Sequence, residues 1–175
     1  DSADCDVSAE QLLGKRVRVD IALGARGQRS VEGVVSELAH VGFIATGTPA
    51  GTSTGARYRL VLRPSLWLLS RNRDCRVFEG QSVPEILAEL FAYHGIAEVE
   101  FKLCESYRAR AQCVQYLESD LSFAQRLMHE EGLYYYFEQD ADRHLLILAD
   151  SPQAHGSVPG WQSFTGSQVS VPSQN

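Results

Sequence analysis

Residues 113–138 read CVQYLESDLSFAQRLMHEEGLYYYFE, and their central part has the pattern of an amphipathic helix. Ser119 or Asp120 supplies the N-cap, because either side chain accepts a hydrogen bond from a free backbone N–H of the first turn. Gly132 ends the helix, since glycine readily takes the left-handed conformation that follows a helix terminus. The apolar residues between these ends fall within about 160° of the helical wheel. They are Leu121, Phe123, Ala124, Leu127 and Met128.

Segments around this helix are predicted to be strands. Residues 113–117 precede it and residues 133–138 follow it, and residues 99–103 alternate apolar and polar side chains as a half-buried strand does. Polar residues 139–143 join 133–138 to 144–148, which predicts a β-hairpin. The C-terminal half of the chain therefore combines strands with helices.

A further amphipathic helix is predicted upstream, beginning at Ser82-Val83-Pro84-Glu85. Ser82 and Glu85 have the spacing of a capping box, Pro84 is tolerated in the first turn, and Gly95 ends the helix. The apolar face comprises Val83, Ile86, Leu87, Leu90 and Phe91. Burying such a face contributes roughly 8–15 kcal/mol before entropy is counted, so the helix needs a partner surface, expected to be a sheet.

The N-terminal part of the chain has the alternation of β-strands. Residues 17–23 alternate Val, Ile and Leu with Arg, Asp and Ala, the pattern of a strand with one buried face. Residues 24–28 contain glycines and predict a turn, after which 31–36 alternate again, so we expect a hairpin. Residues 58–63 predict another strand, whereas 46–55 are rich in Gly, Thr, Ser and Pro and are predicted to form a loop.

These segments give an α+β fold class with a division near residue 73. Residues 12–73 are expected to form a small antiparallel β-barrel or sheet, and residues 74–150 an α+β module with two amphipathic helices. Residues 1–11 are a polar lead-in. Residues 151–175 lose periodicity and are rich in Ser, Gly, Gln and Pro, which is typical of a linker or frayed end.

The composition argues against several classes of protein. The chain has 175 residues and a net charge of −6, and an acidic balance argues against nucleic acid as the main partner, because phosphate binding needs a basic surface. No apolar run approaches the roughly 18 residues that span a bilayer, so we expect no membrane anchor. The acidic, polar N-terminus lacks the features of a signal peptide.

The four cysteines, Cys5, Cys75, Cys104 and Cys113, follow no CxxC or zinc-binding spacing. Four cysteines in 175 residues are too few for a disulfide scaffold. We therefore expect reduced thiols that pack as small apolar groups.

His129-Glu130-Glu131 resembles half of a zinc-protease motif, but Leu133 stands where a second histidine is needed. Zinc requires that second ligand on the same helix face. We therefore predict no metal site and no cofactor site, and we interpret the segment as a solvated helix end.

Residues 51–55 match the letters G-x-S-x-G around Ser53, a pattern found in hydrolases. A nucleophile elbow needs a strand before the serine and a helix after it, whereas here a predicted loop precedes Ser53 and a predicted strand follows. No P-loop and no dinucleotide-binding glycine pattern occurs either. We therefore predict no catalytic residue.

Glu130 and Glu131 lie in the last turn of the predicted helix. There the negative end of the helix dipole costs a carboxylate roughly 0.3–1 kcal/mol. A cationic partner offsets that cost. We expect at least one of the two to form a structural ion pair with Arg108, Arg110 or Arg126.

Residues 134–137 form an aromatic strand. Such a strand can stack carbohydrate rings or bases, but it is more often half core and half interface. Alternation places Tyr134 and Tyr136 on one face and Tyr135 and Phe137 on the other, so the face turned away from the core is a candidate contact between chains. Further interaction candidates in the preceding strand are Tyr116 and Glu118.

The run from Tyr107 to Glu138 closely resembles the VgrG family of type VI secretion spike proteins. It has the family's Val-Gln-Tyr, Glu-Ser-Asp, Arg-Leu, Glu-Glu-Gly and Tyr-Tyr-Phe in the family's order. Upstream, Leu12-Leu13-Gly14-Lys15, Arg63-Pro64 and Arg76-Val77-Phe78 also match in order, so the resemblance covers about residues 12–150.

Three departures from the family pattern concern specific surface pairs. Leu117 stands where the family usually has a basic residue, and His129 stands where an acidic residue is common. Ala111-Gln112 replaces a more typical acidic–aromatic pair. These departures put those pairs in doubt and leave the fold unaffected.

The resemblance implies the first portion of a phage-tail-like hub. Such a hub is a homotrimer when full length, sits on an Hcp-like hexameric tube, and continues into a C-terminal spike domain of the same chain. We therefore expect a structural protein, not an enzyme, that couples the tube to the puncturing needle. Assembly in the bacterial cytoplasm is expected, followed by export through the type VI apparatus to the outside or into a target cell.

Two alternatives remain open at this point. One is the tail hub of a phage or prophage, which has the same shape. The other, from a different class, is a fragment of an effector enzyme such as a cell-wall hydrolase. Solution mass separates a hub from the enzyme, because a complete hub is trimeric and a hydrolase need not be.

Overall fold

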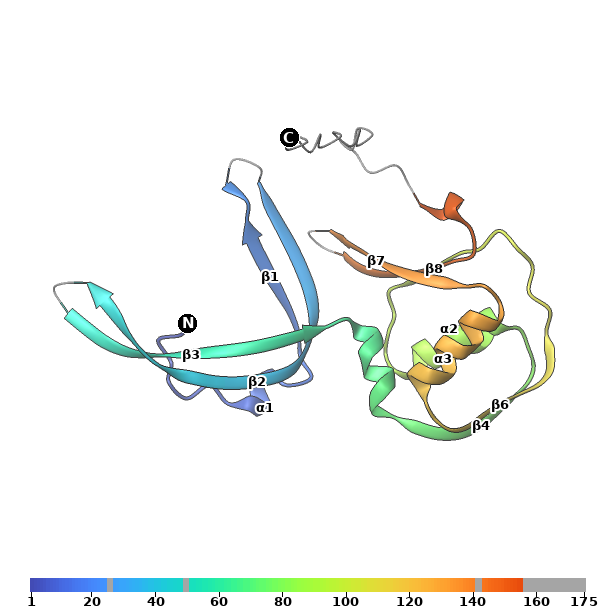
Figure 1. Ribbon diagram of the computed structural model, residues 1–175, viewed down its shortest axis with the longest axis horizontal. Helices are drawn as coiled ribbons and strands as arrows, with labels where there is room; N and C mark the ends of the chain where they lie inside the picture. Colours follow the sequence, from blue (N-terminus) through green and yellow to red (C-terminus); the bar gives the residue numbers. More distant parts are fainter. Residues whose placement is uncertain (25–26, 49–50, 141–142, 156–175) are drawn as a thin grey trace, which may run out of the picture.

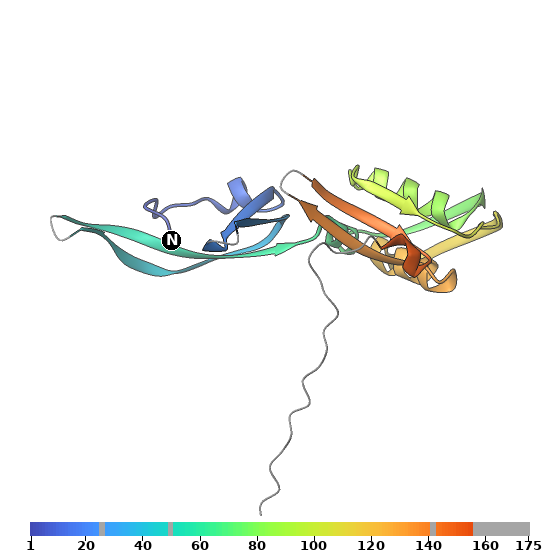
Figure 2. The ribbon, with the colours of Figure 1, turned by 90° about the horizontal axis from the view of Figure 1, so that it is seen from above.

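The N-terminal part of the chain folds into an antiparallel sheet of β1 (Arg16–Ala22), β2 (Gln28–Thr48) and β3 (Gly51–Arg63), in the order β1-β2-β3. The computed structural model describes residues 1–24, 27–48, 51–140 and 143–155. Figures 1 and 2 show this sheet at one end of an elongated molecule, and the longer helices with the remaining strands at the other end.

The register of this sheet brings apolar side chains of neighbouring strands together. Val19 pairs with Val31 across β1 and β2, and Val35 pairs with Leu62 across β2 and β3. The β2–β3 ladder shifts register after Val35 and again after His40, and such bulges bend a strand. β2 pairs with β1 through its first part and with β3 through its remainder, so these strands form an open sheet and not a closed barrel.

The prediction of a loop at residues 46–55 is wrong. β2 extends to Thr48, β3 begins at Gly51, and Thr46 pairs with Ser53. The small and polar side chains of residues 46–55 show only that this segment lacks an apolar face to bury. An antiparallel ladder, however, is held by backbone N–H and C=O groups, which every non-proline residue has.

The polar lead-in follows the free edge of β3. Ser2 forms an antiparallel bridge with Ala56, and Asp1 accepts a hydrogen bond from Arg57 Nε at 2.7 Å. The lead-in then forms a short helix, α1 (Ala9–Leu12), before β1. Ala56 is buried as a result of this coverage.

Two elements that follow the sheet have no clear signal in the sequence. A 3-10 helix, η2 (Ser65–Arg71), buries Leu66 and Leu69, and β4 (Arg73–Gln81) follows it. β4 turns Phe78 and the stem of Arg76 inward and leaves Val77 exposed. Its inward and outward positions therefore do not coincide with apolar and polar residue types.

The helix α2 (Val83–Tyr93) confirms the predicted helix at both ends. The backbone N–H of Ser82 donates to Glu85 Oε2 at 2.7 Å as part of the capping box. Gly95 follows the helix with a φ of 67°, a conformation that glycine adopts without strain. All five residues of the predicted apolar face are buried.

The helix α3 (Asp120–Glu130) follows directly from β6 (Arg110–Ser119). Ser119, and not Asp120, is the N-cap, because its Oγ accepts a hydrogen bond from Ser122 N at 3.0 Å. Gly132 has a φ of 70° and ends the helix as predicted. β6 is longer than the predicted 113–117 and pairs antiparallel with β4.

The third sheet contains β5 (Val99–Lys102), β7 (Tyr134–Asp140) and β8 (Arg143–Ala149), in the order β5-β8-β7. The β7–β8 hairpin confirms the prediction, although the pairing of Asp140 with Arg143 makes its turn shorter than the predicted 139–143. β5 runs parallel to β8, so a long connection must separate them in sequence. β6, α3 and β7 form that connection.

Residues 151–155 continue β8 into a 3-10 helix, η3 (Pro152–Ala154). Ser151 Oγ accepts a hydrogen bond from Gln153 N at 3.3 Å and stabilises its start. The prediction of a linker or frayed end is therefore wrong for residues 151–155. The rest of that predicted segment, residues 156–175, lies outside the described residues.

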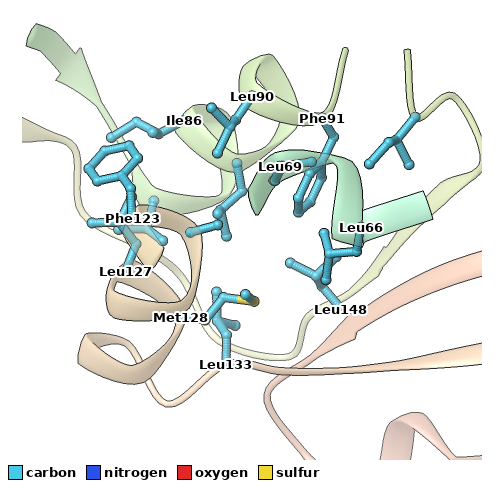
Figure 3. Close-up of a cluster of buried hydrophobic side chains, with 14 of the residues drawn as sticks. Leu66, Leu69, Ile86, Leu90, Phe91, Phe123, Leu127, Met128, Leu133 and Leu148 are labelled. Carbon is cyan, nitrogen blue, oxygen red and sulfur yellow. The ribbon is translucent and has the colours of Figure 1, made fainter. Parts of the chain in front are cut away.

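One apolar core joins α2, α3, η2 and the inner face of the third sheet. Figure 3 shows side chains of the two helices pointing toward one another, with those of η2 and β8 beside them. Phe78 of β4 stacks on Phe123 of α3 at a ring-centroid distance of 5.5 Å. The partner of α2 is thus both a helix and a sheet, whereas the sequence predicted a sheet alone.

All four cysteines are free thiols. Cys113 is buried in the core, as expected for a small apolar group. Cys5, Cys75 and Cys104 are exposed, so the prediction of apolar packing is wrong for these three.

Replacing Leu90 by Ala should lower the free energy of unfolding by about 2–5 kcal/mol, because Leu90 is fully buried and the change leaves a cavity between helices. Urea denaturation followed by circular dichroism measures this loss. Glu89→Ala is the matched control on the exposed face of the same helix and should change stability by about 0.5 kcal/mol or less. Equal effects of the two substitutions would contradict the position of α2.

Candidate assembly surfaces

The carboxylates at the end of α3 are held by an arginine from β6. Arg110 Nη1 donates to Glu130 Oε2 at 2.7 Å, and Arg110 Nη2 forms a second ion pair with Glu131. These hydrogen bonds hold the pKa of Glu130 below its ordinary value and raise the pKa of Arg110. The positive charge of Arg110 therefore offsets two repulsions: that between the two adjacent carboxylates, and that of the carboxylates with the negative end of the helix dipole.

Arg126 extends this cluster along α3. Its guanidinium pairs with Glu118 Oε1 at 2.7 Å and with Glu130 Oε1 at 3.1 Å, and it donates to the backbone oxygen of Val114 at 3.1 Å. The hydrogen bond with Glu118 is the main cause of the raised pKa of Arg126. The cluster ties α3 to β6 at the molecular surface.

The expectation of a structural ion pair at Glu130 and Glu131 is met through Arg110 and Arg126. Arg108 is exposed and forms no ion pair within the described residues. Glu118, singled out from the sequence as an interaction candidate, is part of the cluster.

A buried carboxylate on α3 organises the α+β module. Asp120 is fully buried, and its Oδ2 lies 2.6 Å from His94 Nε2 and 3.1 Å from Arg76 Nη2. Asn72 Nδ2 donates to the same oxygen at 2.9 Å, and Gln115 Nε2 donates to Oδ1 at 2.6 Å. The donors come from the η2–β4 junction, from β4, from the residue that follows α2 and from β6, so one carboxylate on α3 joins four other segments. We call these residues the Asp120 cluster.

Burial of Asp120 by itself raises the pKa of its carboxyl group, but the hydrogen bonds from Gln115, His94 and Asn72 with the charge of Arg76 outweigh it, so the pKa is lowered. The ring of Tyr93 lies beneath Arg76, with the guanidinium carbon 4.5 Å from the ring centroid. The carboxylate thus stays ionised in a dry environment because its charge is matched.

The sequence did not predict this cluster, because Asp120 at the start of a helix was interpreted only as a cap. The spacing of residues along α3 does contain a signal for the burial of Asp120. Asp120, Phe123, Ala124, Leu127 and Met128 follow the i, i+3, i+4, i+7, i+8 spacing, so Asp120 occupies a position on the buried face of α3. A carboxylate at such a position requires partners, which come from segments that are distant in sequence.

The aromatic strand has the predicted alternation. Tyr134 and Tyr136 stack on one face of β7 with ring centroids 6.4 Å apart. His155 packs on both rings, and the two hydroxyls donate to the backbone oxygens of Ser151 and Ala154. Residues 151–155 therefore cover this face in part, which leaves less of it free for another chain.

The opposite face of β7 points toward the core. Phe137 packs against the core, and Tyr135 is about one-third exposed. Both line a hollow of about 170 Å³ together with Arg63, Trp67 and neighbouring residues of η2 and α3. Arg63 and Arg71 lie over the Trp67 ring at 5.7 and 5.6 Å.

The outer face of the β4–β6 ribbon is apolar and uncovered. Val77 and Val114 are cross-strand partners and are 54% and 46% exposed, and Tyr116 beside them is 71% exposed. Leu117 has a φ of 49°, the one positive φ among the described residues that are not glycine. Tyr116 and Leu117 lie opposite Cys75, where the register shift gives β6 one residue more than β4, and both side chains are exposed.

The sheet of β1–β3 has an apolar face that is left exposed among the described residues. Val19, Ile21 and Leu23 are 44%, 44% and 45% exposed, and Leu60 on β3 is 40% exposed. The prediction of a buried face along residues 17–23 is therefore wrong for the chain as it stands. The alternation is present, but the surface that would bury it is not among the described residues.

The motifs that could have indicated a catalytic or metal site do not form one within the described residues. They contain no group of three or more His, Cys, Asp or Glu side chains placed to hold a metal ion. Ser53 lies inside β3, so no helix follows it as a nucleophile elbow requires. None of the helices within these residues is long and apolar enough to cross a bilayer.

A family model described as phage tail baseplate hub (GPD) matches residues 2–169. The chain belongs to the phage tail baseplate hub family. This membership agrees with the α+β architecture and with the resemblance that the run from Tyr107 to Glu138 carries.

Relatives of the hub chain are spike proteins. The type VI secretion system spike protein VgrG1a of Pseudomonas aeruginosa is 39% identical over 162 residues, which cover 93% of this chain and 24% of the relative. VgrG3 of Vibrio cholerae is 32% identical, covering 98% of this chain and 16% of the relative. The resemblance to the hub region of VgrG is confirmed, and the chain spans about a quarter or less of these relatives.

A solved structure also matches the hub chain. The E. coli c3393 protein is described as a component of the type VI secretion system with structural similarity to the T4 bacteriophage tail proteins gp27 and gp5. It superposes with a TM-score of 0.73 and 28% identity, covering 89% of this chain and 41% of that chain. The fold of the hub chain is therefore that of a tail-hub component.

Replacing Asp120 by Asn should destabilise the hub chain by about 3–5 kcal/mol, because Arg76 would lose its buried counter-charge. The pKa of Asp120 is lower in the folded chain than in the unfolded chain, where it is near 4. The ionised carboxylate therefore stabilises the fold above about pH 4, and this stabilisation is lost as the pH falls through the folded pKa. Urea denaturation between about pH 2 and pH 7 should show a shallower pH dependence for Asp120→Asn. Asp74→Asn, which removes the more exposed partner of Arg76, should have a much smaller effect than Asp120→Asn.

Replacing Arg110 by Met should lower stability by about 1 kcal/mol at low salt, since Glu130 and Glu131 lose a shared partner. The loss should shrink in about 1 M salt, which screens partly exposed charges. Arg108→Met is the control and should have no measurable effect. A loss that does not depend on salt would assign Arg110 a packing role.

Proposed function

We propose that the chain is a structural hub segment of a contractile type VI secretion spike. The observation that carries the proposal is the uncovered apolar face of the β1–β3 sheet, with Val19, Ile21, Leu23 and Leu60 exposed beside a complete core in the α+β module. Exposed apolar surface of this kind marks a contact that further protein must cover. Membership in the baseplate hub family supports the same role.

The proposed assembly is a homotrimer of the full-length protein. In that assembly the β1–β3 sheet of each chain packs against further strands of the hub, and the ring sits on an Hcp-like tube while a C-terminal spike domain continues the chain. The open sheet supports this arrangement, because among the described residues only the bridge from Ser2 to Ala56 extends it beyond its three strands. The function of the segment is geometric: it sets the position of neighbouring chains in the ring.

A non-enzymatic role is part of the proposal. Asp120 and Arg110 have their charges matched by ion pairs and hydrogen bonds that link secondary-structure elements. Groups satisfied in this way stabilise a fold and are not free to transfer protons to a substrate. Export through the secretion apparatus after assembly in the cytoplasm is proposed from the names of the VgrG relatives.

The proposal predicts that full-length protein carrying this chain is trimeric, and that Ile21→Glu shifts it toward monomer by placing a charge on the uncovered face. Light scattering after size-exclusion chromatography measures the mass, and circular dichroism verifies that each variant is folded. Glu105→Lys, a charge change on an exposed loop, should leave the trimer intact. A monomeric full-length protein, or a trimer indifferent to Ile21→Glu, would overturn the assignment of this face.

A further inference from the structure

His144 lies where the β1–β3 sheet meets the α+β module. It is 5% exposed, and its ring stacks on Phe137 of β7 at a centroid distance of 4.9 Å. Gln139 of β7 lies beside it, with its Nε2 3.0 Å from His144 Nδ1 and 3.4 Å from the backbone oxygen of Glu32 on β2. The Gln139 amide therefore joins the buried imidazole to the neighbouring sheet.

The hydrogen bonds at this junction fix the protonation state of the ring. An amide NH₂ group only donates, so Nδ1 of His144 must accept and its proton must be on Nε2. Nε2 is buried and has no hydrogen-bond partner within the described residues. His144 is thus neutral at the junction, and burial lowers its pKa.

A second proton changes the geometry of the junction. Once Nδ1 carries a proton, it faces the Gln139 NH₂ group as donor against donor. The conflict is relieved only if the Gln139 side chain leaves or its amide turns over, and either movement takes Nε2 away from the Glu32 oxygen. Protonation of His144 and the Gln139–Glu32 hydrogen bond therefore exclude one another.

The charged groups around the ring do not remove this conflict. Glu32 on β2 and Glu98 before β5 favour the imidazolium, whereas Arg16 on β1 opposes it. Glu98 Oε2 accepts a hydrogen bond from the backbone N–H of His144 at 3.2 Å and is not in contact with the ring nitrogens. No carboxylate among the described residues bonds the buried Nε2.

The surroundings of the junction leave space for movement. The chain passes from the sheet to the module through Arg63 and Pro64, which line the hollow of about 170 Å³ at the same place. Phe137 lines that hollow and stacks on His144. The hollow therefore lies directly beside the stacked pair of Phe137 and His144.

We infer that the His144–Gln139–Glu32 contact is a proton-sensitive junction that couples the β1–β3 sheet to the α+β module at neutral pH and releases it at mildly acidic pH. Because the folded pKa of His144 lies below that of the unfolded chain, near 6.5, the stabilisation is complete at neutral pH and is lost as the pH falls below that value. The inference goes beyond the proposed hub role and does not require it.

Hydrogen exchange of the backbone amides tests the inference. Protection of residues 31–34 and 137–139, corrected for intrinsic exchange, should fall about tenfold between about pH 7 and pH 5, while protection of α2 stays constant. His144→Phe keeps an aromatic ring beside Phe137 and should abolish the pH response. Gln139→Leu should show the low protection already at neutral pH, with little further change on acidification.

His129→Phe is the matched control, because His129 is exposed on α3 and does not lie at the junction. Its pH response should equal that of the parent protein. If His144→Phe is folded and still loses protection on acidification, the carboxylates of Glu32 and Glu98 carry the response and the inference is wrong. If His144→Phe does not fold, a Gln139→Leu variant that retains parental protection and pH response overturns the inference independently.

Discussion

The α+β module depends on the burial of one charge, that of Asp120. Its carboxylate accepts hydrogen bonds from Asn72, Gln115 and His94 and pairs with Arg76, so both oxygens are satisfied away from water. A buried charge is tolerated only when its partners are fixed in position. These partners belong to the η2–β4 junction, β4, the end of α2 and β6. The apolar core supplies most of the stabilisation, but a core of similar side chains tolerates several arrangements. The Asp120 cluster favours the one in which these segments converge.

The sequence predicted the parts of this module that depend on local signals. The capping box at Ser82, the glycines at 95 and 132 and the spacing of apolar residues gave both helices, because each signal acts within a few residues of the chain. The sequence did not predict β4 or the Asp120 cluster. β4 turns the stem of Arg76 inward and Val77 outward, and Arg76 is stable inside only because Asp120, 44 residues later, is there to receive it. Such pairings depend on tertiary structure and leave no periodic pattern.

The β1–β3 sheet shows a different limit of sequence reasoning. Its alternation was read correctly as a strand pattern, but the inference from alternation to burial assumes that the covering surface belongs to the same chain. Val19 and Ile21 are exposed because that surface is not among the described residues. The error at residues 46–55 has the opposite origin: a ladder held by backbone groups extends further than any apolar pattern. In both cases the side-chain pattern indicates which face could be packed, whereas strand pairing depends on backbone hydrogen bonds.

The two parts of the molecule therefore differ in what keeps them rigid. The α+β module is fixed internally by its core and by the Asp120 and Arg110 contacts. The sheet is attached to it by the chain at Arg63, where the guanidinium groups of Arg63 and Arg71 lie over the Trp67 ring, and by the contact of β2 with β7. The apolar face of the sheet, in contrast, remains exposed at Val19, Ile21 and Leu60. The module is thus stabilised by contacts among the described residues, whereas under the proposed hub role a neighbouring surface completes the sheet.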